Sequence, residues 1–509
     1  MVVLSIDLDA FYCTVEQKYD PSLDNDTPFI VYQKDCIATL SYAARALGIK
    51  KLGSVAEAKK RFPGIRVVNG ESLAKYRHEG KLLCKFIQNL VQVPVERLGL
   101  EELRFDISDI VDYNVKQLQS RGLLDFERLQ VEDDEEGVWL NVSTDHQFFC
   151  EDFFFNIGSA KLYPPEHGGF LIDFKEYVEY YVGAHLALYI QERITTESRL
   201  SASIGVAKNI TLAKMICSYN KPSGVSLLVP PYGQQFLNSK LVKHIPGFGH
   251  ATMLHICRAL DVKGAVLKES GSERKIENGQ EKNGHELRDQ TNRDAEPSSE
   301  MDLTPDTLTV QNLLENFSAE ELNQLPILKP SYLWDLLHGI DNSIIQETPL
   351  YPNQISIENS YSLKGLSFDD TRSELRALCV SLLKQLYVDI IDAHTKSWIA
   401  YPTSLRLSIR HTGKLMLPYP SRRSKTTPVY SYVYELCQKD ENKDEADIVA
   451  MASRIVEDNV YPMLEELWKP VAPNEIIKLL NVAATNMVEK QPPVKRPPGG
   501  KRTLHNYFG

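Results

Sequence analysis

The sequence lacks the features that mark zinc-finger, secreted and membrane proteins. Its eight cysteines are scattered without a CxxC pair, which argues against a zinc site or a disulfide framework and favours a reducing compartment. Asp7 and Asp9 interrupt the apolar N-terminal run, so no secretory signal is expected. No run approaches the roughly 20 apolar residues that span a bilayer. We therefore expect a soluble intracellular protein that does not bind membranes.

Positive charge is also scarce overall. The 509 residues carry a net charge of −11, and with 43% hydrophobic and 25% charged residues the composition is that of an ordinary globular protein. Binding to nucleic acid needs a local excess of Lys and Arg, so the total charge argues mildly against a protein that does nothing else. A basic face can still exist within an acidic chain. The length predicts about three or four domains.

Acidic residues end two strand-like apolar runs. The first run, VVLSIDLDAFY, contains Asp7, and the second, PVERLGLEELRFDIS, contains Glu101 and Glu102. If these strands pair, three carboxylates converge, and they repel one another unless a divalent cation neutralises them. The backbone carbonyl of Leu8 is an expected further oxygen ligand. Two-metal phosphoryl transfer uses such an arrangement, although an acidic strand end is also a common solvated turn.

A second set of residues could hold a nucleotide. Thr39, Tyr42 and Arg45 form a TxxYxxR pattern where a strand becomes a helix, and Lys214 lies on a different predicted helix. Together their hydroxyls and cations could clamp a triphosphate, although each alone is an ordinary surface residue. Tyr12 follows the first strand closely, so its ring is expected near the sugar, where it would exclude a 2′-hydroxyl. Core packing is the simpler alternative for Tyr12.

Helical and strand-like patterns alternate over the first 230 residues, which predicts an α/β arrangement. We expect a strand over residues 1–8, a helix at FYCTVEQKY, a long amphipathic helix from Glu71 and a strand at LSASIGVA. Residues from about 269 to 305 are charged and polar, which predicts a disordered insertion. The acidic loop at 132–137 and the Phe-rich run after it are expected to form a surface insertion with aromatic packing.

Two features could contact a DNA backbone. Gly247 and Gly249 fall between apolar helical segments, where glycines let backbone amides approach a phosphate, as in a helix-hairpin-helix; a tight structural turn is the alternative. Further on, SLRLSIRH alternates apolar and basic residues, so one strand face packs while the other presents guanidinium groups to DNA or to solvent. The basic residues of this region are Arg406, Arg410, Lys414, Arg422, Arg423 and Lys425.

The final nine residues, KRTLHNYFG, place Leu504, Tyr507 and Phe508 at the spacing of a sliding-clamp-binding peptide. One helical turn would bring the three side chains onto one face. The preceding PPVKRPPGG behaves as a flexible tether. A frayed terminus is the alternative, and the basic KRPPGGKR could also serve nuclear import.

In the order of its motifs, the chain resembles the Y-family translesion DNA polymerases. The motifs run from residue 1 to about 488, with gaps at the two insertions: DLDAFYCTVE, TLSYAARALGIKKL, VAEAKKRFPG, VNGESLAKYR, PVERLGLEELRFDIS, GVAKNITLAKM, IPGFG and SLRLSIRH. The resemblance implies an α/β (α+β multidomain) right-hand polymerase. Its parts would be a palm (1–11 and 73–224), fingers (12–72), a thumb with the hairpin and the insertion (225–347), a little finger (354–488) and a flexible tail (489–509).

The resemblance also implies roles for single residues. Asp7, Glu101 and Glu102 would be the catalytic carboxylates that bind Mg2+, with Mn2+ as an alternative, and Tyr12 would be the steric gate. The implied triphosphate contacts are Thr39, Tyr42, Arg45 and Lys214, with the amides around Phe11 and Cys13. The residues that align over the templating base, where some family members narrow the pocket and favour Hoogsteen pairing, are Gln33, Lys34 and Cys36.

Glu101 departs from the family, which has Asp at this position. The additional methylene moves the carboxylate by more than about an ångström, and a displacement on that scale can cost about 100-fold in rate. We expect the backbone to compensate. A preference for Mn2+ and a weakened catalysis are the alternatives.

The sequence therefore predicts a nuclear, monomeric, error-prone DNA polymerase that adds deoxynucleotides to a primer opposite damaged template by two-metal nucleotidyl transfer. Its partners would be primer-template DNA, deoxynucleoside triphosphates and a sliding clamp. Two other functions stay open at this point. One is a catalytically weakened protein that binds primer-template DNA and recruits repair partners through its clamp-binding peptide, and the other is a template-independent transferase.

Overall fold

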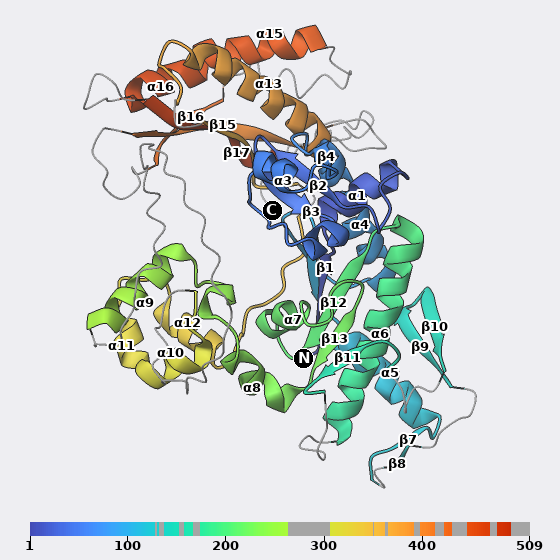
Figure 1. Cartoon of the computed structure of the whole chain (residues 1–509). Helices are drawn as coiled ribbons and strands as arrows, with labels where there is room; N and C mark the ends of the chain where they lie inside the picture. Colours follow the sequence, from blue (N-terminus) through green and yellow to red (C-terminus); the bar gives the residue numbers. More distant parts are fainter. Residues whose placement is uncertain are drawn as a thin grey trace, which may run out of the picture. The chain divides into compact units, whose positions relative to one another are not determined.

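The computed structural model divides into two compact units, Met1–Thr348 and Pro349–Gly509. Both units combine helices with strands (Figure 1), so the predicted mixed α/β class is confirmed. The described residues are 1–127, 130–131, 137–151, 157–165, 174–262, 306–349, 351–361, 365–390, 398–412, 422–429, 445–468 and 476–489. Predicted features outside them are the insertion at 269–305, most of the acidic loop at 132–137, Lys414, and the tail with Leu504, Tyr507 and Phe508.

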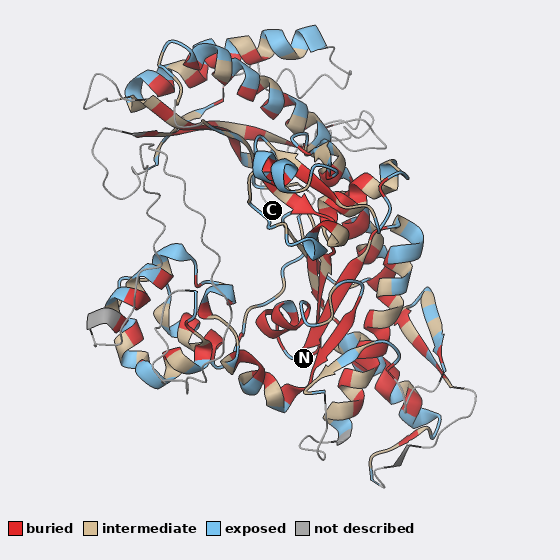
Figure 2. Ribbon diagram, in the orientation of Figure 1, coloured by how far each residue is buried: buried red, intermediate tan, exposed pale blue. Residues whose placement is uncertain are grey.

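A sheet with the strand order β11-β13-β12-β1-β6-β5 forms the centre of the first unit. β1 is antiparallel to both β6 and β12, so the two acidic strands do pair, which is the condition on which a convergence of their carboxylates depended. Figure 2 shows the central strands almost entirely buried. The strands are β1 (Val3–Leu8), β5 (Val95–Leu98), β6 (Glu102–Asp106), β11 (Lys161–Tyr163), β12 (Ala202–Ala207) and β13 (Val225–Leu228).

Helices cover both faces of this sheet. Leu4 and Ile6 of β1 share a core with α4 (Ala74–Val91), α5 (Ser108–Ser120) and α6 (Phe174–Ser198), whereas Val3 shares another core with α7 (Ile210–Ile216). Alternate residues of a strand point to opposite faces, so β1 contributes to both cores. The short strands after α5 are β7 (Leu124–Asp125), β8 (Gln130–Val131), β9 (Val138–Ser143) and β10 (His146–Cys150).

A smaller sheet in the same unit has the order β3-β2-β4 and its own core. Ser54 caps α3, because its side chain accepts a hydrogen bond from a first-turn amide. α1 packs against α4, where Glu16 pairs with Lys75 and Glu79 pairs with Lys18. The elements are α1 (Phe11–Tyr19), β2 (Phe29–Gln33), β3 (Cys36–Leu40), α2 (Tyr42–Ala46), α3 (Val55–Arg61) and β4 (Arg66–Asn69).

Short helices follow β13 and share the core of α7. The glycine-containing turn lies before α9, where Gly247 has a φ of +93° and a Cβ atom would lie 2.6 Å from Leu333 Cδ2. The fold therefore requires glycine at this position. The helices are η1 (Pro230–Tyr232), α8 (Gly233–Asn238), η2 (Val242–His244), α9 (His250–Val262), α10 (Val310–Asn316), α11 (Ala319–Asn323) and α12 (Pro330–Leu337).

The second unit is a sheet with the order β14-β17-β15-β16 and helices on one face (Figure 1). Leu405, Leu407 and Ile409 of β15 are buried beneath these helices, as the alternating pattern predicted. The elements are β14 (Gln354–Ser360), α13 (Thr371–Ile390), β15 (Ala400–Thr412), β16 (Arg423–Pro428), α15 (Glu445–Ile455), η3 (Val456–Val460), α16 (Tyr461–Leu467) and β17 (Ile476–Glu489). Over the part of the chain that the structure describes, no helix has the length and apolarity to span a bilayer.

Candidate active site

Asp7 and Glu102 occupy directly opposite positions on the antiparallel strands β1 and β6. Residues paired in this way project from the same face of a sheet, with their side chains close together. Asp7 is the more accessible of the two, with 39% of its side chain exposed against 16% for Glu102. The structure therefore brings together one carboxylate from each of the two predicted acidic strands.

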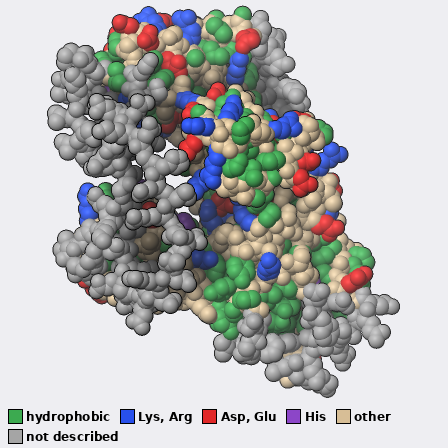
Figure 3. Space-filling view, in the orientation of Figure 1, with side chains coloured by type: hydrophobic (Ala, Val, Ile, Leu, Met, Phe, Trp, Pro, Cys, Tyr) green, Lys and Arg blue, Asp and Glu red, His purple; other side chains and the backbone are tan. Residues whose placement is uncertain are grey.

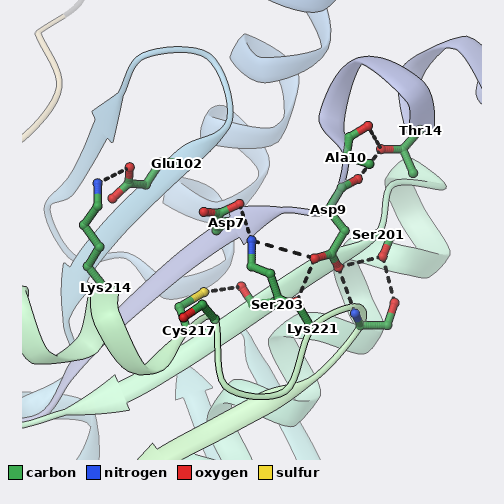
Figure 4. A network of polar contacts seen from close by, with 12 residues as sticks. Asp7, Asp9, Ala10, Thr14, Glu102, Ser201, Ser203, Lys214, Cys217 and Lys221 are labelled. Carbon is green, nitrogen blue, oxygen red and sulfur yellow. Dashed lines mark hydrogen bonds and ion pairs between the residues drawn. The ribbon is translucent and has the colours of Figure 1, made fainter. Parts of the chain in front are cut away.

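A lysine neutralises each of these carboxylates (Figure 4). Lys214 of α7 places its Nζ 2.7 Å from Glu102 Oε2, and Lys221, in the turn between α7 and β13, places its Nζ 2.7 Å from Asp7 Oδ1. Burial is the largest single effect and alone would lower the pKa of Lys221, but the charge and hydrogen bond of Asp7, together with the nearby Cys217 and Asp9, raise it overall. The sequence indicated Lys214 and missed Lys221, because a single lysine in a turn carries no periodic signal.

Glu101 lies in the turn before β6, beside the pair. Its backbone carbonyl accepts a hydrogen bond of 3.2 Å from the amide of Leu8, which ties the turn to the end of β1. Burial raises the pKa of the Glu101 carboxyl, and the charge of Asp7 raises it further, while the ammonium group of Lys51 opposes the increase. Glu101 is thus electrostatically coupled to the pair.

The two paired carboxylates suit a hard divalent cation. Glu102 Oε1 is buried and has no hydrogen-bond partner, and carboxylate oxygens are the ligands that Mg2+ prefers. Within the described residues, no three Asp, Glu, His or Cys side chains are grouped so that they could hold a metal ion. The donors in place are therefore Asp7 and Glu102, each held by an ammonium group, rather than a preformed trio with Glu101.

Tyr12 has a fixed ring position near the start of α1. Its ring stacks on that of Tyr76, with centroids 4.1 Å apart and an interplanar angle of 15°. Tyr76 is fully buried, so it supports Tyr12 from one side. Burial raises the pKa of Tyr12, and the charge of Glu101 adds to the increase. At the same helix start, the amide of Cys13 is already used, since it donates to the Ala10 carbonyl at 2.7 Å.

The predicted phosphate-binding residues of α2 lie together. The Arg45 guanidinium lies over the ring of Tyr42, 4.6 Å from its centroid, and Arg45 is exposed. The hydroxyl of Tyr42 donates to Asp9 Oδ1 at 3.4 Å, which links α2 to the end of β1. Thr39 is buried at the end of β3, just before this helix. The Tyr42 hydroxyl thus contacts Asp9 directly, and the Arg45 guanidinium is linked to the same region through the Tyr42 ring.

The residues predicted to lie over a templating base gather at the tip of the β2–β3 hairpin, where Gln33 pairs with Cys36. Lys34 has a φ of +55° in the tight turn, and its amide donates to Glu71 Oε1 at 3.0 Å. The Gln33 side chain donates to the Gly70 carbonyl at 2.9 Å. Cys36 is exposed. These bonds fix the tip of the hairpin against the segment that follows β4.

The basic residues of the second unit fall on two faces of its sheet. Arg406 and Arg410 alternate with the buried residues of β15, so they project from the face opposite the helices. Arg422 bridges to Glu358 of β14 at 2.9 Å. Arg423 pairs with Ile409 and shares its helix-covered side. Lys and Arg side chains are also interspersed with acidic ones on the face drawn in Figure 3, in keeping with the net charge of −11.

Comparison with known proteins places most of this site within a matched region. Residues 6–218 match the model of the impB/mucB/samB family. The chain is 31% identical to DNA polymerase iota of Homo sapiens over 252 residues, which are 49% of this chain and 30% of the relative. It is 28% identical to DNA polymerase eta of Drosophila melanogaster over 307 residues, 56% of this chain and 33% of the relative.

A bacterial protein shows a similar likeness. DNA polymerase IV of Francisella tularensis subsp. novicida is 24% identical over 251 residues, which are 48% of this chain and 52% of the relative. The chain therefore spans between 30% and 52% of the length of these three relatives. Asp7, Glu102, Lys214 and all of α1 and α2 lie inside the region that matches the family model, whereas Lys221 lies just beyond it.

Proposed function

We propose that this chain, whose residues 6–218 belong to the impB/mucB/samB family of Y-family DNA polymerases, is an error-prone translesion DNA polymerase. It adds deoxynucleotides to a primer terminus opposite damaged template. The observation that carries the proposal is the pairing of Asp7 with Glu102 at the end of β1, with cations and a buried unpartnered oxygen beside them. The names of the similar proteins, all DNA polymerases, support the reaction type.

The proposal extends to the parts of a right-hand polymerase. The palm comprises residues 1–11 and 73–224, the fingers 12–72, the thumb 225–347 and the little finger 354–488. The hydrophobic cores support this division in part, because the small sheet and the second unit each have a core of their own, whereas the short helices of the thumb share a core with α7 and Val3 of the palm. The active site then lies on the palm sheet, with the small fingers sheet beside it.

Asp7 and Glu102 are the residues that would hold Mg2+ or Mn2+, with Glu101 and the Leu8 carbonyl as further oxygen donors. When bound, the cations would lower the pKa of the primer 3′-hydroxyl and neutralise charge that develops on the phosphates. Asp7 and Glu102 orient the reacting groups because the two strands fix their positions. Lys221 provides a positive charge close to Asp7, where it would attract the incoming triphosphate.

The remaining residues of the nucleotide site act by binding and exclusion. Tyr42 and Arg45 present a hydroxyl and a guanidinium to the triphosphate, with Lys214, buried Thr39 and the amides around Phe11 as further contacts, whereas the Cys13 amide already donates to the Ala10 carbonyl. Tyr12, stacked on Tyr76, is the steric gate that excludes a 2′-hydroxyl. The hairpin tip lies over the templating base with its three residues Gln33, Lys34 and Cys36.

DNA contacts complete the proposal. Arg406 and Arg410, on the open face of the second unit, and Arg422 at its edge bind duplex phosphates. The amides near Gly249 contact the duplex from the thumb. The backbone is accessible there, because nothing lies within 4 Å of a Cβ built at this glycine.

Leu504, Tyr507 and Phe508 bind a sliding clamp, and the enzyme acts as a monomer in the nucleus.

The test is a single-nucleotide insertion panel with four templates and four deoxynucleotides, on undamaged and damaged primer-template, with DNA affinity measured in parallel. The expected result is insertion that depends on the identity of the template base. Insertion that ignores the template would instead indicate a template-independent transferase. Normal DNA binding without any insertion would favour the weakened DNA-binding protein. This is the second candidate because of Glu101 and because, within the described residues, no three acidic, His or Cys side chains are grouped to hold a metal ion.

A further inference from the structure

We infer that Asp9 is a positioning residue, whose buried carboxylate holds Lys221 in place against Asp7 for nucleotide binding. The inference rests on the proposed function, because it gives that site a support that the sequence patterns did not reveal. Asp9 is only 1% exposed, so its carboxylate is not accessible to a substrate. Its effect must pass through the residues that it holds.

The Asp9 carboxylate is hydrogen-bonded on both oxygens (Figure 4). Two strong bonds reach Oδ2, one reaches Oδ1, and the Tyr42 hydroxyl adds a longer one to Oδ1 at 3.4 Å. An ionised carboxylate has about four lone-pair sites, so these donors satisfy it. The strong donors, each at 2.8 Å, are Ser201 Oγ and the Ser223 amide to Oδ2, and Ser203 Oγ to Oδ1.

These bonds tie together segments that are far apart in the sequence. Ser203 belongs to β12, Ser223 to the turn before β13, and Tyr42 to α2, while Asp9 directly follows the end of β1. The backbone of Asp9 is also fixed, because its amide donates to the Ser201 carbonyl at 2.8 Å. A residue with all these partners has one allowed position. Asp9 therefore defines where the turn at residues 220–224 lies relative to β1.

Lys221 depends on that turn. Its Nζ lies 3.9 Å from Asp9 Oδ1 and 2.7 Å from Asp7 Oδ1, so it lies between the two carboxylates. Two residues later, Ser223 has a φ of +52°, an unfavourable conformation for a residue with a side chain. The hydrogen bond from the Ser223 amide to Asp9 stabilises this conformation. Without the charge of Asp9, the turn loses this support and Lys221 loses one of its two counter-charges.

The test is a double-mutant cycle that compares Asp9→Asn, Lys221→Ala and the double variant. The measured quantity is the affinity for a deoxynucleoside triphosphate bound to the full chain on a dideoxy-terminated primer-template. We expect Asp9→Asn to weaken nucleotide binding about tenfold. The double variant should bind like Lys221→Ala alone, within about twofold, because Asp9 acts through Lys221. DNA affinity should change by less than about twofold in all three.

Two further variants separate positioning from folding. Ser203→Ala removes one bond to Asp9 Oδ1 and leaves its charge, so it should weaken nucleotide binding in the same direction and decide the matter if Asp9→Asn does not fold. Asp20→Asn is the matched control, since the Asp20 side chain is 48% exposed and also accepts hydrogen bonds from a serine amide and a serine hydroxyl, both of Ser22. The control should leave nucleotide affinity unchanged.

The inference would be overturned if the losses of nucleotide affinity in Asp9→Asn and Lys221→Ala were independent, so that the two fold-changes multiply in the double variant. An Asp9→Asn variant with wild-type nucleotide affinity would overturn it as well. Neither result would touch the proposed function, provided that the wild type extends primers. A wild type that neither binds nucleotide nor extends a primer would instead overturn the proposed function, and the positioning role of Asp9 with it.

Discussion

Replacement of Glu102 by Gln should separate activity from stability at the candidate active site. The substitution keeps the shape of the side chain and removes the charge of a carboxylate whose Oε1 is buried without a partner. Loss of one preorganised electrostatic group in an active site typically costs about 100- to 1000-fold in rate. We therefore expect single-turnover insertion of one nucleotide, measured at saturating DNA, to fall at least about 100-fold.

The cost in stability should be small. Among the described residues, Glu102 forms one ion pair, with Lys214, whose side chain is 43% exposed. Ion pairs with an exposed partner contribute about 0.2–1 kcal/mol to the free energy of unfolding. The unfolding midpoint of the variant should therefore lie within a few degrees of the wild type, or about 2–4 °C for 1 kcal/mol in a unit of 150–250 residues.

Glu96→Gln is the matched control on the neighbouring strand β5. Glu96 forms a two-pronged ion pair with Arg104 of β6, with both N–O distances at 2.8 Å, and the two side chains are 20% and 21% exposed. Its loss should destabilise the protein at least as much as Glu102→Gln and change insertion by less than about twofold. If Glu102→Gln kept insertion within about threefold of the wild type, the assignment of Glu102 would be refuted.

Three further predictions concern sugar selection, acid stability and DNA binding. Tyr12→Ala should lower the preference for deoxynucleotides over ribonucleotides, measured as a ratio of kcat/KM values, about 10- to 100-fold, because steric overlap of about 1–3 kcal/mol is removed; an unchanged ratio would exclude the gate. Burial alone would raise the pKa of Asp341, but hydrogen bonds from Ser343 and Thr211 outweigh it and hold the pKa below its usual value. The carboxylate thus contributes stability that is present above about pH 4 and is lost as the pH falls through the folded-state pKa. Denaturant unfolding should show Asp341→Asn less stable by about 1.5–3 kcal/mol at pH 7, and a difference that does not shrink in acid would contradict this. Arg406→Ala should reduce the slope of log DNA affinity against log salt concentration by about one. Arg423→Ala, on the opposite face of the sheet, should leave this slope unchanged. Equal effects of the two substitutions would argue against a single DNA-binding face.

The strands and helices around the site could be predicted because their signals are local. β1, α1 and α4 follow from apolar runs and periodicity, and their observed bounds lie close to the expected ones. The pairing of the two acidic strands was a conditional expectation, and the register that places Asp7 opposite Glu102 emerges only in the structure. A pattern in one strand cannot specify its partner in another.

Asp9 and Lys221 show where local patterns are insufficient. Asp9 meets Ser201, Ser203 and Ser223, which are separated from it by about 200 residues of chain, and none of these serines stands out in the sequence. Lys221 lies in a turn, where charged residues are common and have no periodicity. Long-range hydrogen bonds of this kind depend on the completed sheet, so sequence patterns do not reveal them.

Backbone geometry also limits two of the predicted DNA contacts. Arg422 and Arg423 are consecutive, and consecutive residues of a strand point to opposite faces, so both could not belong to one DNA-binding face. Gly247 has a positive φ and close contact with Leu333, so its glycine is explained by the fold before any contact with phosphate is considered. In both cases simple backbone geometry limits the functional assignment.

The most direct test of the proposed polymerase is primer extension by the wild type and by Asp7→Ala, with Mg2+ and with Mn2+, alongside DNA affinity. The proposal predicts that the wild type extends the primer according to the template with at least one of the two cations. Asp7→Ala should bind primer-template DNA within about twofold of the wild type and extend it with neither cation. Extension by Asp7→Ala at the wild-type rate, or normal DNA binding by a wild type that never extends the primer, would contradict it.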